Sequence, residues 1–384
     1  MAQAPAPDLP LGPVTRDYFG LVMNRADPKQ PWPSVPFGSW RLWDAYVTWA
    51  QLEPQPGQWD FARLDRLVAE AEAHDAKLLL VLAHSPPWAS ARPDEPSAYR
   101  PGVAAEPARI ADWVSYVSTV AKRYKGRIRE YEIWNEPSDR GHYTGTVAQL
   151  VTLACEARKA LKAVDSGNLV VSPASAGGGR HIQYLDEFLA SGGAACIDVV
   201  AHHFYVPRFG PEAMVPLIRE VRQVMVRRGV EKLPLWNTET GWWIASTDGS
   251  PDSALVTKGG WRKLDADREA GAVIERAFLL ARAEGVARFY WYAWSNPYGW
   301  SLTDARGMPK PATKYWLDTY DVMHGAEVLI CSEAGTSQWS CNLRDAARGN
   351  VALDWRDESA LVPRKGPAVR RFEADGIPRK RSIP

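Results

Sequence analysis

Two glutamates end apolar segments that otherwise have the composition of buried strands. Glu136 ends the segment Tyr131–Glu136, and Glu239 ends the segment Leu235–Glu239. Burying a lone carboxylate is costly, so two of them at strand ends require a reason. Glycosidic bonds are cleaved by such a pair, in which one group acts as acid and then base and the other as nucleophile. We therefore predict that Glu136 and Glu239 are a catalytic pair that cleaves a glycosidic bond with retention of anomeric configuration.

Eight apolar segments of strand length are distributed along the chain. They are Tyr18–Met23, Trp40–Asp44, Lys77–His84, Arg129–Glu136, Leu169–Ala174, Ile197–Tyr205, Leu233–Glu239 and Arg288–Trp294. Near-continuous apolar runs are typical of strands in a buried parallel sheet. No Gly-x-Gly-x-x-Gly turn follows the first of them, which argues against a dinucleotide-binding fold.

Amphipathic stretches with helical periodicity separate most of these strands. They are Phe61–Ala73, Ile110–Tyr124, Val147–Ala163, His181–Ala190, Pro211–Arg228 and Arg268–Glu284, with Pro311–Met323 as the closing helix. The first connection, Asp27–Pro36, is Pro-rich and has little helical character. The alternation predicts an α/β fold, a (β/α)8 TIM barrel with a small C-terminal β-appendage.

The pattern changes at about Gly325, where short β-type runs replace the alternation. These runs are Val328–Cys331, Trp339–Leu343 and Val351–Trp355. We divide the chain into an N-terminal extension (1–16), a catalytic barrel (17–324), and a β-rich appendage with a basic tail (325–384). The N-terminal segment is a candidate to complete the appendage, and residues 364–381 are expected to form a solvated or frayed tail.

A barrel places its active site at the carboxyl ends of the strands. The strands that end in Glu136 and Glu239 would be the fourth and the seventh, on facing sides of a narrow mouth. That arrangement fits the roughly 5–5.5 Å between the carboxyl groups of retaining enzymes. Glu132 lies four residues deeper on the same face as Glu136, and we predict that it pairs with Arg41.

Several motifs resemble those of clan A glycoside hydrolases. Trp134–Pro137 resembles their acid/base signature, Thr238–Gly241 their nucleophile segment, and His203–Tyr205 their His-x-Tyr motif. Trp49–Phe61 and Ser85–Ala89 look most like glycoside hydrolase family 39, which includes β-xylosidases and exopolysaccharide-degrading glycosidases. The resemblance covers about residues 18–320.

The resemblance implies Glu136 as the general acid/base and Glu239 as the nucleophile, and it implies further roles around them. Asn135 would bind the 2-hydroxyl of the sugar, and Tyr205 would donate a hydrogen bond to Glu239. Arg41 would lower the pKa of Glu239 through its fixed charge. His203 would contact the same region. Because neighbouring side chains on a strand face opposite ways, we expect His203 rather than His202 to enter the pocket.

Aromatic residues supply the expected sugar-binding surfaces. The resemblance implies Trp294 as the floor under the sugar with Trp291 as second candidate, and His84 and Trp88 as pocket lining. Asp44 either binds a sugar hydroxyl or caps a loop. About half of five loop residues are expected to build distant subsites, and the sequence does not say which: Trp242, Trp243, Trp261, Tyr298 and Trp300.

Composition restricts the partners. Lys and Arg number 46 against 45 Asp and Glu, so no net charge attracts the chain to nucleic acid or an anionic membrane. No apolar stretch is long enough to span a membrane. The opening residues resemble the remnant of a cleavage site, which predicts an exported protein without its signal peptide. The appendage is smaller than the accessory domains of the xylosidases of glycoside hydrolase family 39. We favour a monomer, although the sequence does not determine the oligomeric state.

The cysteines have no metal-binding pattern, and we predict neither a metal nor an organic cofactor. Cys331 and Cys341 flank a turn-like stretch and could close a hairpin disulfide. The sequence favours neither this disulfide nor two free thiols. Cys155 and Cys196 are expected to be buried free thiols.

The predicted function is hydrolysis of β-linked poly- or oligosaccharide, with internal cleavage of a bacterial exopolysaccharide favoured. The main alternative is an exo-acting β-xylosidase or β-glucosidase. A non-catalytic carbohydrate-binding barrel is a second class, and a metal-dependent hydrolase using His84, His202 and His203 is a third.

Overall fold

The eight predicted barrel strands are present, each within about three residues of its expected bounds. The computed structural model describes residues 11–26, 30–296, 300–334, 337–346, 349–357 and 379–382. Its parallel sheet contains β1 (Phe19–Met23), β2 (Ser39–Leu42), β3 (Lys77–Leu82), β4 (Glu130–Ile133), β5 (Leu169–Val171), β6 (Val200–His202), β7 (Leu235–Thr240) and β10 (Val286–Ser295). Their order is β5-β4-β3-β2-β1-β10-β7-β6. Hydrogen bonds from Ser172 N to Val199 O (2.9 Å) and from Asp198 N to Val170 O (2.7 Å) join β5 to β6. The predicted (β/α)8 barrel is therefore confirmed.

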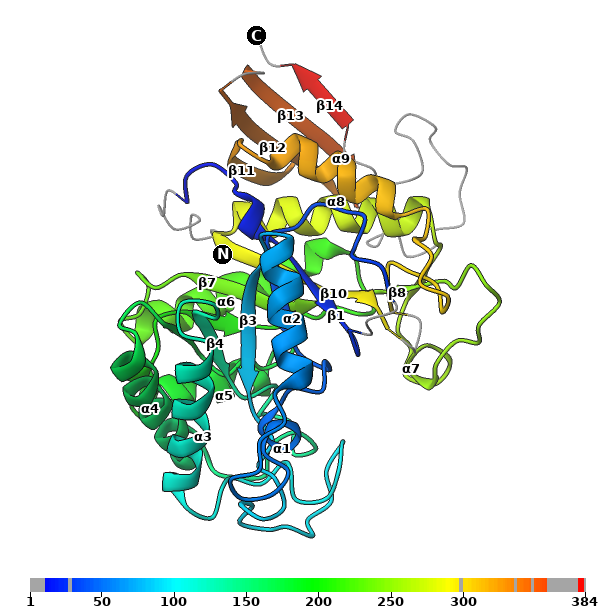
Figure 1. The fold of residues 1–384 in the computed structure, drawn as a ribbon. Coiled ribbons are helices and arrows are strands. Elements are labelled where there is room, and N and C mark those ends of the chain that lie inside the picture. The colour runs from blue at the N-terminus through cyan, green and yellow to red at the C-terminus, as the bar shows by residue number, and fades with distance from the viewer. Residues whose placement is uncertain are drawn as a thin grey trace.

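Helices surround the barrel as the amphipathic patterns predict (Figure 1). The long ones are α2 (Ala62–Ala73), α3 (Ile110–Arg123), α4 (Val147–Val164), α5 (Arg180–Ala190), α6 (Met214–Arg227), α8 (Arg268–Ala283) and α9 (Thr313–Met323). Short helices α1 (Trp49–Leu52) and α7 (Ala254–Thr257) lie in loops. None of the described helices is long and apolar enough to cross a membrane.

Side-chain alternation along the strands divides the core into two clusters. Val22, Leu79, Trp236 and Tyr290 belong to the cluster inside the barrel. Trp291, the neighbour of Tyr290, belongs instead to the larger cluster that the strands form with the helices. This division decides which aromatic residues of β10 can reach the barrel mouth.

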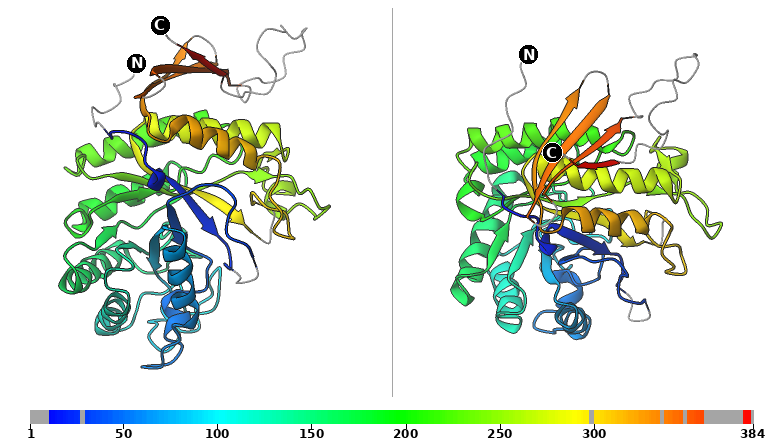
Figure 2. Two further views of the ribbon diagram at one scale, coloured as in Figure 1. Left: turned by 45° about the horizontal axis from the view of Figure 1, so that its top comes forward. Right: turned by 90° about the horizontal axis from the view of Figure 1, so that it is seen from above.

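A second, antiparallel sheet follows the barrel and packs against α8 (Figures 1 and 2). It contains β11 (Glu327–Ala334), β12 (Gln338–Asp345), β13 (Gly349–Arg356) and β14 (Arg379–Ser382), in that order. The expectation of a frayed tail is wrong for Arg379–Arg381, because this segment pairs with β13, which would otherwise be an edge strand. Residues 364–378 lie outside the described residues. The N-terminal segment contributes Val14, whose N–H bonds Ala326 O just before this sheet.

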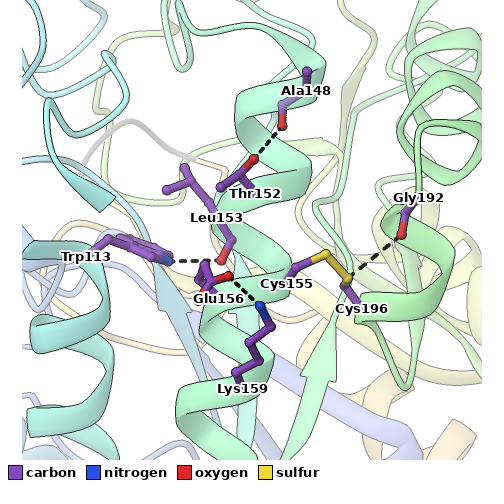
Figure 3. Close-up of a disulfide and its surroundings, with 9 residues drawn as sticks. All are labelled: Trp113, Ala148, Thr152, Leu153, Cys155, Glu156, Lys159, Gly192 and Cys196. Carbon is purple, nitrogen blue, oxygen red and sulfur yellow. Dashed lines mark hydrogen bonds and ion pairs between the residues drawn. A yellow bond between two sulfur atoms is a disulfide. The ribbon is translucent and has the colours of Figure 1, made fainter. Parts of the chain in front are cut away.

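Both cysteine pairs form disulfides, and Figure 3 shows the one between Cys155 and Cys196. Cys331 and Cys341 face each other on β11 and β12. The expectation of free thiols at Cys155 and Cys196 is wrong. Cys155 lies on α4 and Cys196 in the turn Gly193–Cys196 after α5, and packing of this turn against α4 brings their Cα atoms to 4.7 Å. The pair is 41 residues apart, so only tertiary packing reveals it.

We expect the double variant Cys155→Ser/Cys196→Ser to unfold at a lower urea concentration. Crosslinking a loop of this length restricts the unfolded chain, which stabilises typical proteins by about 2–4 kcal/mol. Activity in the absence of urea should be unchanged, since neither cysteine is near the strand ends that carry Glu136 and Glu239. Equal urea midpoints for wild type and variant would show that this disulfide contributes no stability.

Candidate active site

The two predicted carboxylates meet at the barrel mouth. Glu239 lies within β7, and Glu136 follows β4, where its N–H bonds Ala174 O beyond β5 at 2.8 Å. One carboxylate oxygen of each, with a ring nitrogen of His203, lie within 4.8 Å of one another. This is close to the roughly 5–5.5 Å of retaining glycosidases and below the about 6.5–9.5 Å of inverting ones. Both side chains remain partly accessible, 18% for Glu136 and 9% for Glu239.

Arg41 organises the acidic residues beneath the mouth. Its fully buried guanidinium donates from Nε and Nη2 to the two oxygens of Glu132, at 2.7 and 3.0 Å. Nη2 also reaches Asn135 Oδ1 at 2.7 Å, and Nη1 reaches Glu239 Oε2 at 2.8 Å. The predicted pairing of Glu132 with Arg41 is confirmed. One rigid cation therefore holds Glu132 of β4, Asn135 just after β4 and Glu239 of β7.

Glu239 is aimed by donors on both of its oxygens. Tyr205 OH donates to Oε1 at 2.9 Å, opposite the Arg41 contact on Oε2. Burial raises the pKa of Glu239 to about 7. The positive charges of His203 and Arg41 act to lower this pKa, and the negative charge of Glu136 acts to raise it further. Because the two carboxyl groups repel each other's charge, we assign this value to the loss of the last proton from the pair.

His203 contacts Glu136, and its neighbour His202 is turned away. His203 Nδ1 lies 2.9 Å from Glu136 Oε1, and its Nε2 lies 3.1 Å from Thr238 Oγ1. His202 Nε2 instead bonds Gly177 O at 2.7 Å. The side chain of His203 thus enters the site, as alternation predicts. Burial acts to raise the pKa of Glu136, but the hydrogen bond and charge of His203, with smaller contributions from the charges of His142 and Arg41, lower it.

Asp44 closes a loop, as one of its two expected roles predicts, and its carboxylate contacts other residues of the site. Its backbone oxygen accepts from Arg25 N at 2.8 Å, which closes a loop. Its carboxylate accepts from Tyr292 OH at 2.9 Å and from Asn24 Nδ2 at 3.2 Å. Burial raises the pKa of Asp44, while the Tyr292 hydrogen bond and the charge of Arg41 act to lower it. Asp44 is therefore part of a polar network within electrostatic range of the two glutamates.

His84, which follows β3, packs against two aromatic side chains. Its ring packs 4.6 Å from the ring of Tyr99 and 5.2 Å from that of Trp43, measured between centroids. Burial lowers the pKa of His84 to about 3, so the ring is neutral at neutral pH. Its Nε2 has no hydrogen-bond partner among the described residues.

The structure does not bring three predicted aromatic residues into the site. Trp88 donates to Glu53 O at 2.9 Å and packs edge-on against Trp49. Trp291 is fully buried against Trp242 in the outer cluster. Trp294 lines a separate small pocket beside α2, with Arg66 and Leu67 of that helix. Strand alternation and local packing therefore override the roles that the motifs implied.

Tyr292 occupies the position expected for a tryptophan. It belongs to the inner cluster, is bonded to Asp44 and lies 5.5 Å from the ring of Trp300. Trp300 also contacts Tyr205 and Trp261, and Trp243 closes this aromatic group. Trp242 is a core residue, and Tyr298 lies outside the described residues. The period of two from Tyr290 could have identified Tyr292, but the resemblance favoured a tryptophan.

His142 is a second residue that the sequence reasoning missed. Its Nδ1 lies 3.4 Å from Glu136 Oε2 and 3.5 Å from Asn135 Nδ2. Each oxygen of Glu136 therefore has an imidazole nitrogen beside it. The signal available in the sequence was its place six residues after Glu136 in the same strand-to-helix loop.

Comparisons with known proteins identify the family and the fold of this chain. The family described as Cellulase (glycosyl hydrolase family 5) matches residues 35–296. No curated protein matches the sequence. A family 39 glycoside hydrolase from Bacteroides cellulosilyticus WH2 is similar in structure, with a TM-score of 0.66 and 16% identity over 89% of this chain and 71% of that one.

Two further solved structures share the fold. A monomeric β-xylosidase from Caulobacter crescentus CB15 has a TM-score of 0.63 at 20% identity, over 90% of this chain and 75% of its own. A glucosidase from Croceicoccus marinus has a TM-score of 0.64 at 15% identity, over 97% and 82%. The expected clan A assignment is confirmed. The chain belongs to the cellulase family, glycosyl hydrolase family 5, and is a retaining glycoside hydrolase of clan A.

Proposed function

We propose that this protein cleaves internal β-glycosidic bonds of a polysaccharide, with a bacterial exopolysaccharide as the favoured substrate. Glu136 is the general acid/base and Glu239 the nucleophile. The observation that carries the proposal is the approach of the two carboxylates to within 4.8 Å, with Glu239 held by Arg41 and Tyr205. Such donors stabilise the ionised form that a nucleophile requires.

The reaction follows from these contacts. Glu239 attacks the anomeric carbon while Glu136 gives its proton to the departing oxygen, so the glycosidic bond breaks and a glycosyl ester forms. Esterification removes the charge of Glu239, and Glu136 then takes a proton from the attacking water. Asn135, which accepts a hydrogen bond from Arg41, would bind the 2-hydroxyl, and Tyr292 with Asp44 would contact the same sugar.

Exposed side chains on several mouth loops support a cleft with several subsites. Tyr46, Tyr99, Phe209 and Met308 follow β2, β3, β6 and β10, and expose 49%, 41%, 56% and 61% of their surface. Exposed rings stack well on the C–H faces of sugars. The exo-acting alternative draws support from the similar structures, which include a β-xylosidase and a glucosidase.

Export is the second part of the proposal. All four cysteines are in disulfides, which persist in oxidising compartments and are rare in reducing ones. An enzyme that acts on a polysaccharide also encounters this substrate outside the cell. Fractionation of the producing cells should place the protein outside the cytoplasm, and an exclusively cytoplasmic protein would contradict this part.

The function is tested by mass spectrometry of products from β-linked polysaccharides and bacterial exopolysaccharides. Internal cleavage predicts a ladder of oligosaccharides early in the reaction. Release of a single mono- or disaccharide from the first minutes would favour the exo alternative. Sugar binding without product from any substrate would favour a non-catalytic barrel.

The pH dependence should be bell-shaped, because the reaction requires one proton on the carboxylate pair. Burial and the charge of Glu136 raise the pKa of Glu239 to about 7, which we assign to the pair, so kcat/KM should fall above neutral pH as the last proton leaves. The acid limb, where both groups are protonated, lies lower. In Glu136→Gln the basic limb should disappear, and its persistence would assign that limb to another group.

Excess EDTA should leave activity unchanged. Glu136, His203 and Glu239 could geometrically surround a cation, but their facing atoms already bond one another, Arg41 and Tyr205. The measurement is turnover after dialysis against chelator, with and without added Zn²⁺ or Mg²⁺. Loss of activity that metal restores would favour a metal-dependent hydrolase.

A further inference from the structure

Thr238 lies beneath the acid/base candidate, between two side chains that are fully buried. Its Oγ1 is 3.2 Å from Glu132 Oε1 and 3.1 Å from His203 Nε2. Thr238, Glu132 and His203 are each 0% exposed. In such a site each polar group must find its partner within the protein, so the direction of every hydrogen bond can be worked out.

The hydroxyl of Thr238 has one proton, and Glu132 requires it. Glu132 is ion-paired with Arg41, and as a carboxylate it can only accept. Thr238 therefore donates to Glu132 and must accept from its other neighbour. That neighbour is His203 Nε2, which consequently carries a hydrogen.

The other ring nitrogen of His203 faces Glu136. With Nε2 protonated, neutral His203 has a bare lone pair on Nδ1, 2.9 Å from Glu136 Oε1. A bare nitrogen and a carboxylate oxygen at this distance repel each other unless a proton lies between them. The couple of Glu136 and His203 therefore retains one proton, either on the carboxyl group or on the ring.

We propose that Thr238 is a positioning residue for acid catalysis: by fixing the Nε2–H form of His203, it makes the Glu136–His203 couple hold the proton that the departing oxygen receives. This inference rests on the proposed role of Glu136. A turn of the carboxyl group about its last side-chain bond brings the proton to the glycosidic oxygen. The C–O bond then breaks, its electron pair and the proton leave with the aglycone, and the attacking water later replaces the proton.

Without the hydroxyl, His203 is free to adopt the opposite neutral form. An Nδ1–H would donate to ionised Glu136 and stabilise the carboxylate without any shared proton. The couple would then lose its proton at lower pH. The other charged groups facing the couple stay in place when Thr238 is replaced: Arg41 of β2, Glu132 of β4, Glu239 of β7 and His142 of the β4 loop. Glu132 loses the hydroxyl donor on Oε1 but keeps both of its hydrogen bonds from Arg41.

The test uses Thr238→Val, which keeps the branched shape, and Thr238→Ser, which keeps the hydroxyl. The substrates are aryl β-glycosides of the sugar found by the product analysis. On a 4-methoxyphenyl glycoside, whose leaving group needs a proton, kcat/KM at pH 7 should fall at least about tenfold in Thr238→Val. On a 2,4-dinitrophenyl glycoside it should change less than about threefold. The basic limb should move down by about one pH unit, and Thr238→Ser should resemble wild type.

A direct reading of the ring comes from ¹⁵N NMR of His203, assigned with a His203→Gln variant. Wild type should show a protonated Nε2, and Thr238→Val should show the Nδ1–H form. Thr238→Ala serves if the valine variant does not fold. Equal losses on both glycosides, an unmoved basic limb, or an Nδ1–H form in wild type would overturn the inference.

A separate variant distinguishes failure of the proposed function from failure of the role proposed for Thr238. Glu136→Ala should retain the first step on the dinitrophenyl glycoside, and azide should restore turnover by replacing water. If Glu136→Ala shows neither behaviour, Glu136 is not the acid/base. If it shows both while Thr238→Val has no selective effect, only the role of Thr238 is refuted.

Discussion

Glu239→Gln is expected to lower kcat by roughly 10⁴-fold or more on every substrate, a loss of roughly 5 kcal/mol of transition-state stabilisation. An amide cannot form the glycosyl ester, so the change removes the covalent route itself. The replacement keeps the size of the side chain and an oxygen that can accept from Tyr205. Substrate affinity should therefore change little, and the effect should lie in kcat rather than in KM.

The matched control is Glu327→Gln in the antiparallel sheet. Glu327 is a solvent-accessible carboxylate paired with Arg344, and it begins β11 in the second sheet, outside the barrel sheet (Figure 1). Exposed pairs of this kind contribute about 0–1 kcal/mol, so activity and stability should both match wild type. If Glu239→Gln retained even a tenth of wild-type kcat, its assignment as nucleophile would be wrong.

Arg41→Met is expected to damage stability and activity together. The substitution leaves Glu132 completely buried without its cation, and removing one partner of a buried ion pair typically costs about 3–5 kcal/mol. Glu239 also loses the donor on Oε2, which favours its protonated form at neutral pH. Urea unfolding should show the lower stability, and kcat/KM should fall far below that of wild type.

A double variant separates the two effects. In Arg41→Met/Glu132→Met the fully buried charge of Glu132 is gone and only Glu239 has lost its cation, so part of the lost stability should return. Activity should not return, since Glu239 and Asn135 still lack the guanidinium that holds them. A single variant as stable as wild type would mean that Arg41 and Glu132 do not form the buried pair described here.

Local sequence patterns were sufficient for the barrel and for its two carboxylates. Apolar runs such as Lys77–Leu82 and the buried face of α2 follow periods that depend on neighbouring residues alone. Glu136 and Glu239 interrupt such runs, and a charged residue in a buried strand is informative by itself. Glu132 and Arg41 could be paired because both had to be buried in the same barrel.

The missed features depend on contacts between distant segments. Cys155 and Cys196 meet only because the turn after α5 packs on α4. Trp294 and Tyr292 are two residues apart on β10 yet lie in different core clusters, so the resemblance chose the wrong aromatic residue. His142 and Thr238 contact the site through loop closure and a partner on another strand, which periodicity does not report.

The most direct test of the account is peptide mass spectrometry of a trapped glycosyl-enzyme. Glu136→Ala, given a 2,4-dinitrophenyl glycoside of the substrate sugar, should accumulate the ester because the base for its hydrolysis is missing. The account predicts added sugar mass on a single peptide, with fragmentation placing it on Glu239. Sugar mass on any other residue, or burst release of dinitrophenol without an adduct, would contradict it.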